Sequence, residues 1–210
     1  VNNQNMKDCI DLVIVTNEPF PYGAAATNRI LTYSSELSKN KRVKVLIVKP
    51  TELPSNIINN QVLGVFANIE FKYVNNTTIW PQKSSKVVKG YRLLKGLVLT
   101  ILNLRSIRPK SIVMAGVSSS SHSLLLRFLI IFFSKIYKIR IYQEMSEYPP
   151  IQKKKGISKF YKNVHLKLYC QLDGMIIMTR ELSKYFNDLG QPYIFHLPMT
   201  VDFKRFEVSL

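Results

Sequence analysis

One histidine and two glutamates stand just after short apolar segments, where their side chains could do chemistry. His122 follows the serine run that comes after residues 111–115, and Glu144 and Glu147 follow residues 139–143. A neutral imidazole can orient a hydroxyl group, and a carboxylate can hold an acceptor hydroxyl or act as a base. Plainer alternatives stay open: His122 as a surface residue of a first helical turn, and the glutamates as loop acids paired with nearby lysines.

The segment from Asn17 to Arg29 is a second candidate, because it joins an apolar run to an amphipathic helix. Backbone N–H groups at the start of a helix can bind an anion or a hydroxyl group. Gly23 is the only glycine, and alanines follow it, so the G-x-G-x-x-G pattern of dinucleotide binding is absent. The small residues are equally consistent with a helix that packs closely on a sheet. The serine run lacks the G-x-S-x-G pattern, which excludes a hydrolase nucleophile.

Basic residues form two clusters beside apolar helices. Those that we expect at a surface are Lys89, Arg92, Lys95, Lys153, Lys154, Lys155 and Lys159. The first three are spaced by three residues and can share one side of a helix. A cationic amphipathic surface suits an anionic lipid leaflet, and a solvated face is the alternative.

The composition is that of a globular and strongly basic protein. Thirty Lys and Arg against 13 Asp and Glu give a formal net charge of +17, which attracts polyanions and anionic membranes. Cys9 and Cys170 show neither disulfide spacing nor a metal-type cluster, so we expect a reduced, cytoplasmic environment and no metal. No signal-peptide pattern is visible, and the apolar stretch from Leu124 to Phe133 is too short to cross a bilayer. We expect that stretch to be a buried helix, with a membrane-contacting helix as the alternative.

Apolar runs and helical periodicities alternate along the chain. We predict strands at residues 10–16, 43–48, 69–74, 111–115, 139–143, 175–179 and 193–197, with helices between most of them. In the helix before Pro109, five apolar residues recur at helical spacing and are predicted to face the core: Val87, Tyr91, Leu94, Val98 and Ile101. The alternation predicts an α/β fold with a Rossmann-like parallel sheet and helices on both faces. Ligands then lie beyond the carboxyl ends of the strands, beside the first and fourth strands.

Four segments, in this order, resemble one enzyme family. They are the loop 17–29, the glutamate-containing loop after residue 143, the segment 173–186 (DGMIIMTRELSKYF) and the segment 197–202 (LPMTVD). Together they resemble the N-terminal half of glycosyltransferase family 4, retaining enzymes of the GT-B fold, over nearly the whole chain. The resemblance implies an acceptor-binding domain at residues 1–197. Residues 198–210 would begin the linker to a missing C-terminal donor domain.

The resemblance also implies which residues face the cleft between the two domains. Tyr22, Gly23 and Ala24 would lie near the donor phosphates or the acceptor, with Ala24 where a second glycine is common. His122 and Glu144 would be the catalytic residues on the acceptor side. Further substrate contacts are expected from Glu147, Thr179, Arg180 and Glu181.

The implied activity is transfer of a sugar from a nucleotide-sugar donor to a glycan or lipid-linked acceptor in bacterial polysaccharide biosynthesis, without metal or cofactor. The enzyme would be cytoplasmic and peripheral on the inner face of the plasma membrane. This chain alone would be inactive without the domain that binds most of the donor. Two alternatives stay open. One is a basic nucleic-acid-binding α/β module, supported by net charge alone, and the other is a non-catalytic sugar-binding or assembly domain.

Overall fold

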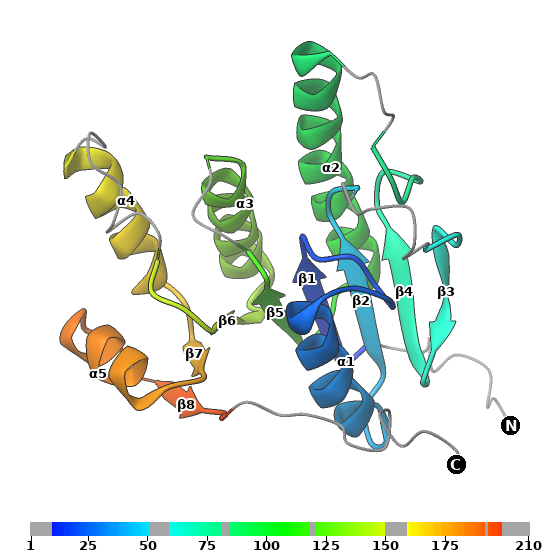
Figure 1. Cartoon of the computed structure of the whole chain (residues 1–210). Helices are drawn as coiled ribbons and strands as arrows, with labels where there is room; N and C mark the ends of the chain where they lie inside the picture. Colours follow the sequence, from blue (N-terminus) through cyan, green and yellow to red (C-terminus); the bar gives the residue numbers. More distant parts are fainter. Residues whose placement is uncertain are drawn as a thin grey trace, which may run out of the picture.

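The computed structural model describes residues 10–50, 59–80, 85–117, 121–149, 159–191 and 193–198. Within them an α/β fold alternates strands and helices along the chain (Figure 1). The strands are β1 (Leu12–Thr16), β2 (Val43–Ile47), β3 (Leu63–Phe66), β4 (Ile69–Tyr73), β5 (Ser111–Ala115), β6 (Arg140–Met145), β7 (Gly174–Ile177) and β8 (Ile194–His196). The helices are α1 (Ala25–Ser38), α2 (Lys86–Ile107), α3 (Ser121–Tyr137), α4 (Lys159–Tyr169) and α5 (Arg180–Asp188).

The strands form one mostly parallel sheet in the order β3-β4-β2-β1-β5-β6-β7-β8. Every predicted strand is present, and the predicted neighbours β1 and β5 pair in parallel from Leu12–Ser111 to Thr16–Ala115. The prediction missed β3, which pairs with β4 in antiparallel fashion at the edge of the sheet. Its residues Leu63, Val65 and Phe66 are apolar, but the strand is only four residues long and contains Gly64, which weakens the sequence signal for a strand.

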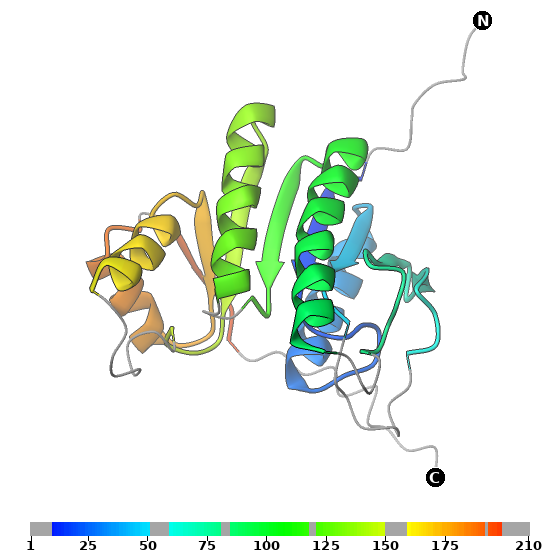
Figure 2. The same cartoon turned by 90° about the horizontal axis from the view of Figure 1, so that it is seen from above.

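Helices cover both faces of the sheet, as predicted, but unequally. The crossover from β1 to β2 runs in one direction along the sheet, and the crossovers that contain α2, α3, α4 and α5 run in the other. Because such crossovers are right-handed, α1 lies on one face and the other helices lie on the opposite face. Figures 1 and 2 show α2, α3 and α4 following one another along that face.

The two faces bury separate apolar clusters. On one face, Ile30 and Leu31 of α1 pack against strand residues such as Ile14 and Val45. On the other, residues of α2 to α5 pack against the alternate strand positions, among them Val13 and Met114. Successive strand residues therefore serve opposite cores, which explains why the central strands are apolar at nearly every position.

The predicted core face of α2 is wrong except at Ile101, which is partly buried against the core. Val87, Tyr91, Leu94 and Val98 are all more than half exposed, whereas Leu97 and Leu104 are among the residues that face the sheet. The helix begins at the N-cap Ser85, whose hydroxyl accepts a hydrogen bond from the N–H of Val88, and it ends before Pro109 as predicted. Because α2 is apolar on most sides, the helical spacing alone did not distinguish the buried side from the exposed one.

A buried arginine joins α3 to α4 and β6. Arg127 is fully buried, and its Nε donates to Oε1 of Gln143 at 2.8 Å. The two terminal nitrogens contact Nδ1 of His165 and the hydroxyl of Tyr169, each at 3.3 Å, and the guanidinium lies 4.4 Å from the Tyr169 ring centre. Among the described residues this cluster contains no carboxylate, so neutral acceptors and an aromatic ring stabilise the charge there.

Candidate functional site

The carboxyl edge of the sheet holds a pocket where the strand order reverses. The turns after β1, β5 and β6 meet there with the first turns of α1. The pocket has a volume of about 380 Å³ and is lined by Glu18, Ala24, Ala25, Ala26, Arg29, Gly116, Val117, Glu144, Met145, Ser146, Glu147 and Tyr148. Reversal points of this kind are where parallel α/β sheets bind ligands. We call this the edge pocket.

Glu18 offers the edge pocket a carboxylate that accepts no hydrogen bond from the described residues. Its backbone N–H donates to the hydroxyl of Thr16 at 2.9 Å, which fixes the turn after β1. Burial raises the pKa of Glu18, and the nearby charge of Glu144 adds to this, while Lys49 and Arg29 oppose it. A carboxylate of raised pKa is more basic, and it accepts hydrogen bonds readily.

Gly116 provides the space in which the Glu18 side chain lies. It has a φ of +61°, and a Cβ there would come within 2.5 Å of Cγ and 3.0 Å of Oε1 of Glu18. Only glycine meets both conditions without strain. The turn after β5 therefore fixes the position of a carboxylate that comes from the turn after β1.

Glu144, the carboxylate favoured by the sequence, is already paired. Nε of Arg29 lies 2.9 Å and one terminal nitrogen 2.8 Å from the same oxygen, Oε1. The Glu144 side chain is 4% exposed and that of Arg29 16%, so the pair is largely shielded from water. Glu144 is the penultimate residue of β6 and not the first loop residue. The partner of Glu144 is therefore Arg29 of α1 and not one of the nearby lysines. Glu147 lines the same pocket at an exposed position.

His122 lies at the same edge of the sheet but is not part of the edge-pocket lining. Burial lowers the pKa of His122, with a further contribution from Lys49, and a hydrogen bond with the backbone of Leu93 in α2 opposes the change. Its Nε2 is buried without a hydrogen-bond partner among the described residues. Asn17 is nearby, since its Nδ2 lies 3.4 Å from the hydroxyl oxygen of Ser123. The imidazole lies between α2 and α3, where burial favours its neutral form.

Tyr22 and Gly23 face away from the edge pocket. The Tyr22 ring packs edge-on against Phe66 at 5.5 Å, beside a smaller pocket of about 240 Å³ on the β3 side. The backbone of Tyr22 exchanges hydrogen bonds with the side-chain amide of Asn59. A Cβ on Gly23 would collide with Thr27, so this glycine lets the turn approach α1 closely. Of the three loop residues implied by the resemblance, only Ala24 lines the edge pocket.

Thr179, Arg180 and Glu181 form the start of α5. The hydroxyl of Thr179 accepts a hydrogen bond from the N–H of Leu182 at 3.2 Å, which caps the helix. Arg180 and Glu181 are exposed and do not line the edge pocket. Their part in substrate binding stays a prediction.

Sequence reasoning missed three charged residues of this edge, Glu18, Arg29 and Lys49. Glu18 stands two residues after β1 and Lys49 two residues after β2, so both follow the rule used for Glu144 and could have been found by it. Arg29 could not, because its partner is 115 residues away.

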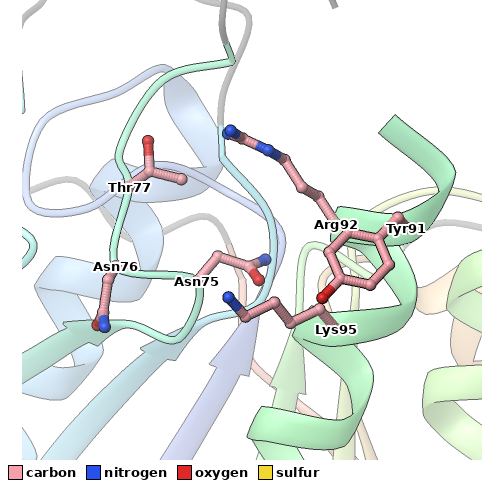
Figure 3. Close-up of a pocket in the computed structure, with 6 residues that line it drawn as sticks. All are labelled: Asn75, Asn76, Thr77, Tyr91, Arg92 and Lys95. Atoms are coloured by element: carbon pink, nitrogen blue, oxygen red, sulfur yellow. The ribbon is translucent and has the colours of Figure 1, made fainter. Parts of the chain in front are cut away.

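A second pocket opens beside the N-terminal half of α2 (Figure 3). It has a volume of about 390 Å³ and is lined by Asn75, Asn76, Thr77, Tyr91, Arg92 and Lys95. The side chain of Asn75 points into the space between the β4 loop and α2, and the chains of Arg92 and Lys95 extend toward the same space. We call it the α2 pocket.

Two other kinds of site were sought in the described residues. No described group of three or more His, Cys, Asp or Glu side chains could hold a metal ion. Within the same residues, every helix falls short of the length and apolarity that crossing a membrane requires.

The sequence matches no protein-family model and no curated protein. The structure is similar over 90% of the chain to that of Phytolacca americana UGT2 complexed with UDP-2-fluoro-glucose and pterostilbene, with a TM-score of 0.53 and 10% identity. It is also similar to Glycyrrhiza uralensis UGT73P12 complexed with glycyrrhetinic acid 3-O-monoglucuronide, over 90% of the chain, with a TM-score of 0.48 and 7% identity. The chain spans about half of these proteins, 53% and 48%. The first likeness confirms the predicted fold class, a Rossmann-like α/β domain of the GT-B type.

Proposed function

We propose that this chain is the acceptor-side domain of a glycosyltransferase of family 4 type. The whole enzyme would transfer a sugar from a nucleotide-sugar donor to a glycan or lipid-linked acceptor in bacterial polysaccharide biosynthesis. Two independent lines support the proposal: the ordered sequence segments that resemble family 4, and the fold shared with UGT2, which was solved with a UDP-sugar analogue. Residues 1–197 would form this domain, and a second, C-terminal domain would bind most of the donor.

The observation that carries the proposal is the free carboxylate of Glu18 in the edge pocket. It lies where the strand order reverses, it has a raised pKa, and it accepts no hydrogen bond from the described residues. Such a group can hold an acceptor hydroxyl in one orientation. The edge pocket is also open to the side on which the carboxyl ends of the strands lie, where a donor domain would face it.

The groups around Glu18 suit the remaining requirements of glycosyl transfer. In the reaction, the bond between the anomeric carbon and the donor diphosphate breaks, and the acceptor oxygen forms the new bond to that carbon. The hydroxyl proton, first directed toward Glu18, leaves with the nucleoside diphosphate. Arg29 is held in place by Glu144, so it supplies an oriented N–H donor and no net positive charge. The cations that stabilise the developing negative charge of the diphosphate would come from the donor domain. Glu144 then acts by positioning Arg29, and neutral His122 would bind farther along the acceptor.

The test is a transfer assay on the whole gene product, with labelled nucleotide sugars and bacterial lipid or glycan extracts as acceptors. Glu18→Ala should lower kcat about 100-fold while KM for the donor stays nearly constant, because a misplaced acceptor commonly costs on the order of 100-fold in rate. Glu18→Gln, which keeps a hydrogen-bond acceptor, should lose less.

The matched control is Glu36→Ala, which removes an exposed glutamate of α1 that pairs with Lys39. It should leave both constants unchanged. Equal rates for wild type and Glu18→Ala would refute the role of Glu18. Absence of transfer by a folded whole gene product with any donor would refute glycosyl transfer itself.

A further inference from the structure

The side of α2 and α3 that faces away from the sheet carries large exposed apolar side chains. They are between 42% and 80% exposed: Val87, Tyr91, Leu94, Val98 and Leu102 on α2, and Leu125, Phe128, Phe132 and Ile136 on α3. We call this set the outer face. On each helix the spacing of three and four residues places them in one stripe, opposite the residues that pack on the sheet.

The two stripes form a single surface. α2 and α3 contact each other and both pack on the same face of the sheet. They lie side by side in both views (Figures 1 and 2). An exposed apolar surface of this extent is uncommon on a protein that stays free in water, and it marks a site of interaction.

The charges around the outer face are all of one sign. The sequences of α2, α3 and α4 contain lysine and arginine but no aspartate or glutamate. On α2, Arg92 and Lys95 lie beside the apolar stripe, and Lys135 lies beside it on α3. A surface that is apolar along its centre and cationic at its rim is complementary to anionic lipid.

The α2 pocket lies directly beside this stripe and suits a phosphate group. Tyr91 belongs both to the outer face and to the pocket lining. Arg92 and Lys95 have no carboxylate within 4.0 Å among the described residues, and the pocket lining contains no acid. The amide nitrogen of Asn75 donates to the carbonyl of Val48 at 3.0 Å, but its buried Oδ1 has no partner in the described residues and could accept from a headgroup hydroxyl.

We propose that the outer face docks onto an anionic lipid bilayer, with the α2 pocket holding the phosphate of a lipid headgroup. The helices lie in the membrane interface, and their apolar stripes contact the acyl boundary. The inference concerns lipid binding and does not rest on glycosyl transfer.

The test measures flotation of the whole chain with vesicles of phosphatidylcholine alone and of phosphatidylcholine with phosphatidylglycerol. Binding should require the anionic lipid and weaken with salt, because the charges act within a Debye length of the surface. The double variant Phe128→Gln with Phe132→Gln should bind the vesicles at least about tenfold more weakly than wild type, because two apolar contacts with the acyl boundary are lost. Its control, Leu63→Gln with Val65→Gln, removes two exposed apolar residues from β3 and should bind like wild type.

The pocket is tested by Arg92→Gln with Lys95→Gln. Removing two charges at the surface should weaken binding roughly 25-fold at low salt, about fivefold per charge. The control Lys39→Gln with Lys41→Gln removes the same charge beside α1, on the opposite face, and should bind within about twofold of wild type. Circular dichroism establishes that each variant folds.

Three results would overturn the inference. One is unchanged binding by the Phe128 and Phe132 variant, which would show that charge alone attracts the protein. Another is equal loss in the variants and their controls. The last is self-association of the wild-type protein without any lipid binding. If the Phe128 and Phe132 variant abolishes that self-association, the outer face is a contact between copies of this chain.

Discussion

The most direct quantitative prediction concerns His165, which is buried between α3 and α4. Burial, followed by the charge of Arg127, lowers the pKa of His165 from 6.5 to about 4. Its ring packs edge-on against Tyr161 at 4.9 Å, and its Nε2 has no hydrogen-bond partner in the described residues. The folded protein therefore keeps this histidine neutral at a pH where the unfolded chain would protonate it.

The sign of the effect follows from proton binding. Between pH 6.5 and about 4 the unfolded chain binds a proton at this position and the folded protein does not. The free energy of unfolding is thus fully retained above pH 6.5 and falls as the pH drops toward 4. A pKa difference of this size corresponds to a loss of about 3 kcal/mol in total, of which about 2.5 kcal/mol is reached by pH 4.5.

The assay is urea unfolding near pH 8 and near pH 4.5, for wild type and for His165→Gln. Carboxylates also titrate in this range, so the informative quantity is the difference between the two proteins. Wild type should lose about 2.5 kcal/mol more than the variant, because glutamine has no proton to gain. Arg127→Gln should reduce the loss, since removal of the buried charge allows the pKa of His165 to rise. The same pH dependence in wild type and His165→Gln would refute the reasoning.

Two paired glycine substitutions test the geometry of the carboxyl edge. Gly116→Ala should lower the melting temperature by several degrees, because the added Cβ meets Glu18 as well as an unfavourable φ, whereas Gly190→Ala shares only the positive φ of +86° and should cost less. Equal costs would show that the Glu18 contact is unimportant. Gly96→Ala should destabilise the protein, because the added Cβ would come within 2.5 Å of the carbonyl oxygen of Val48, just after β2. Gly90→Ala has open space around it and should stabilise the protein by up to about 1 kcal/mol. Thermal unfolding measures both pairs, and stabilisation by Gly96→Ala would contradict the close approach of α2.

The sequence was most informative where burial forces uniform composition. Each central strand, such as β1 with all of its residues buried, is sandwiched between two apolar layers, so its position follows from composition alone. The edge strand β3 was missed because it has only four residues and contains Gly64, so its apolar residues Leu63, Val65 and Phe66 form too short a run. The buried side of α2 could not be predicted either, because Leu94 and Leu97 are equally apolar but only Leu97 faces the sheet.

The sequence indicated which strand-end turns to consider, but not their contacts. The rule that ligands bind beyond the carboxyl ends of the strands pointed to the turns that contain Ala24 and Glu147. Both residues line the edge pocket, and their part in substrate binding stays a prediction. The rule did not reveal that Arg29 forms an ion pair with Glu144, because the two residues come from segments far apart in the chain. With Glu144 paired, Glu18 becomes the partly buried carboxylate of the pocket that can bind a ligand, beside the exposed Glu147. This exchange of roles depends on three-dimensional contacts.

The amino ends of the parallel strands lie at the edge opposite both pockets, and β1 enters the sheet there at Leu12. An affinity tag or fluorophore attached ahead of that strand joins the fold on the side remote from the edge pocket. Immobilising the protein through such a tag would present the carboxyl edge to the solution. The same orientation would suit biosensor measurements of sugar nucleotides and lipid vesicles on one surface.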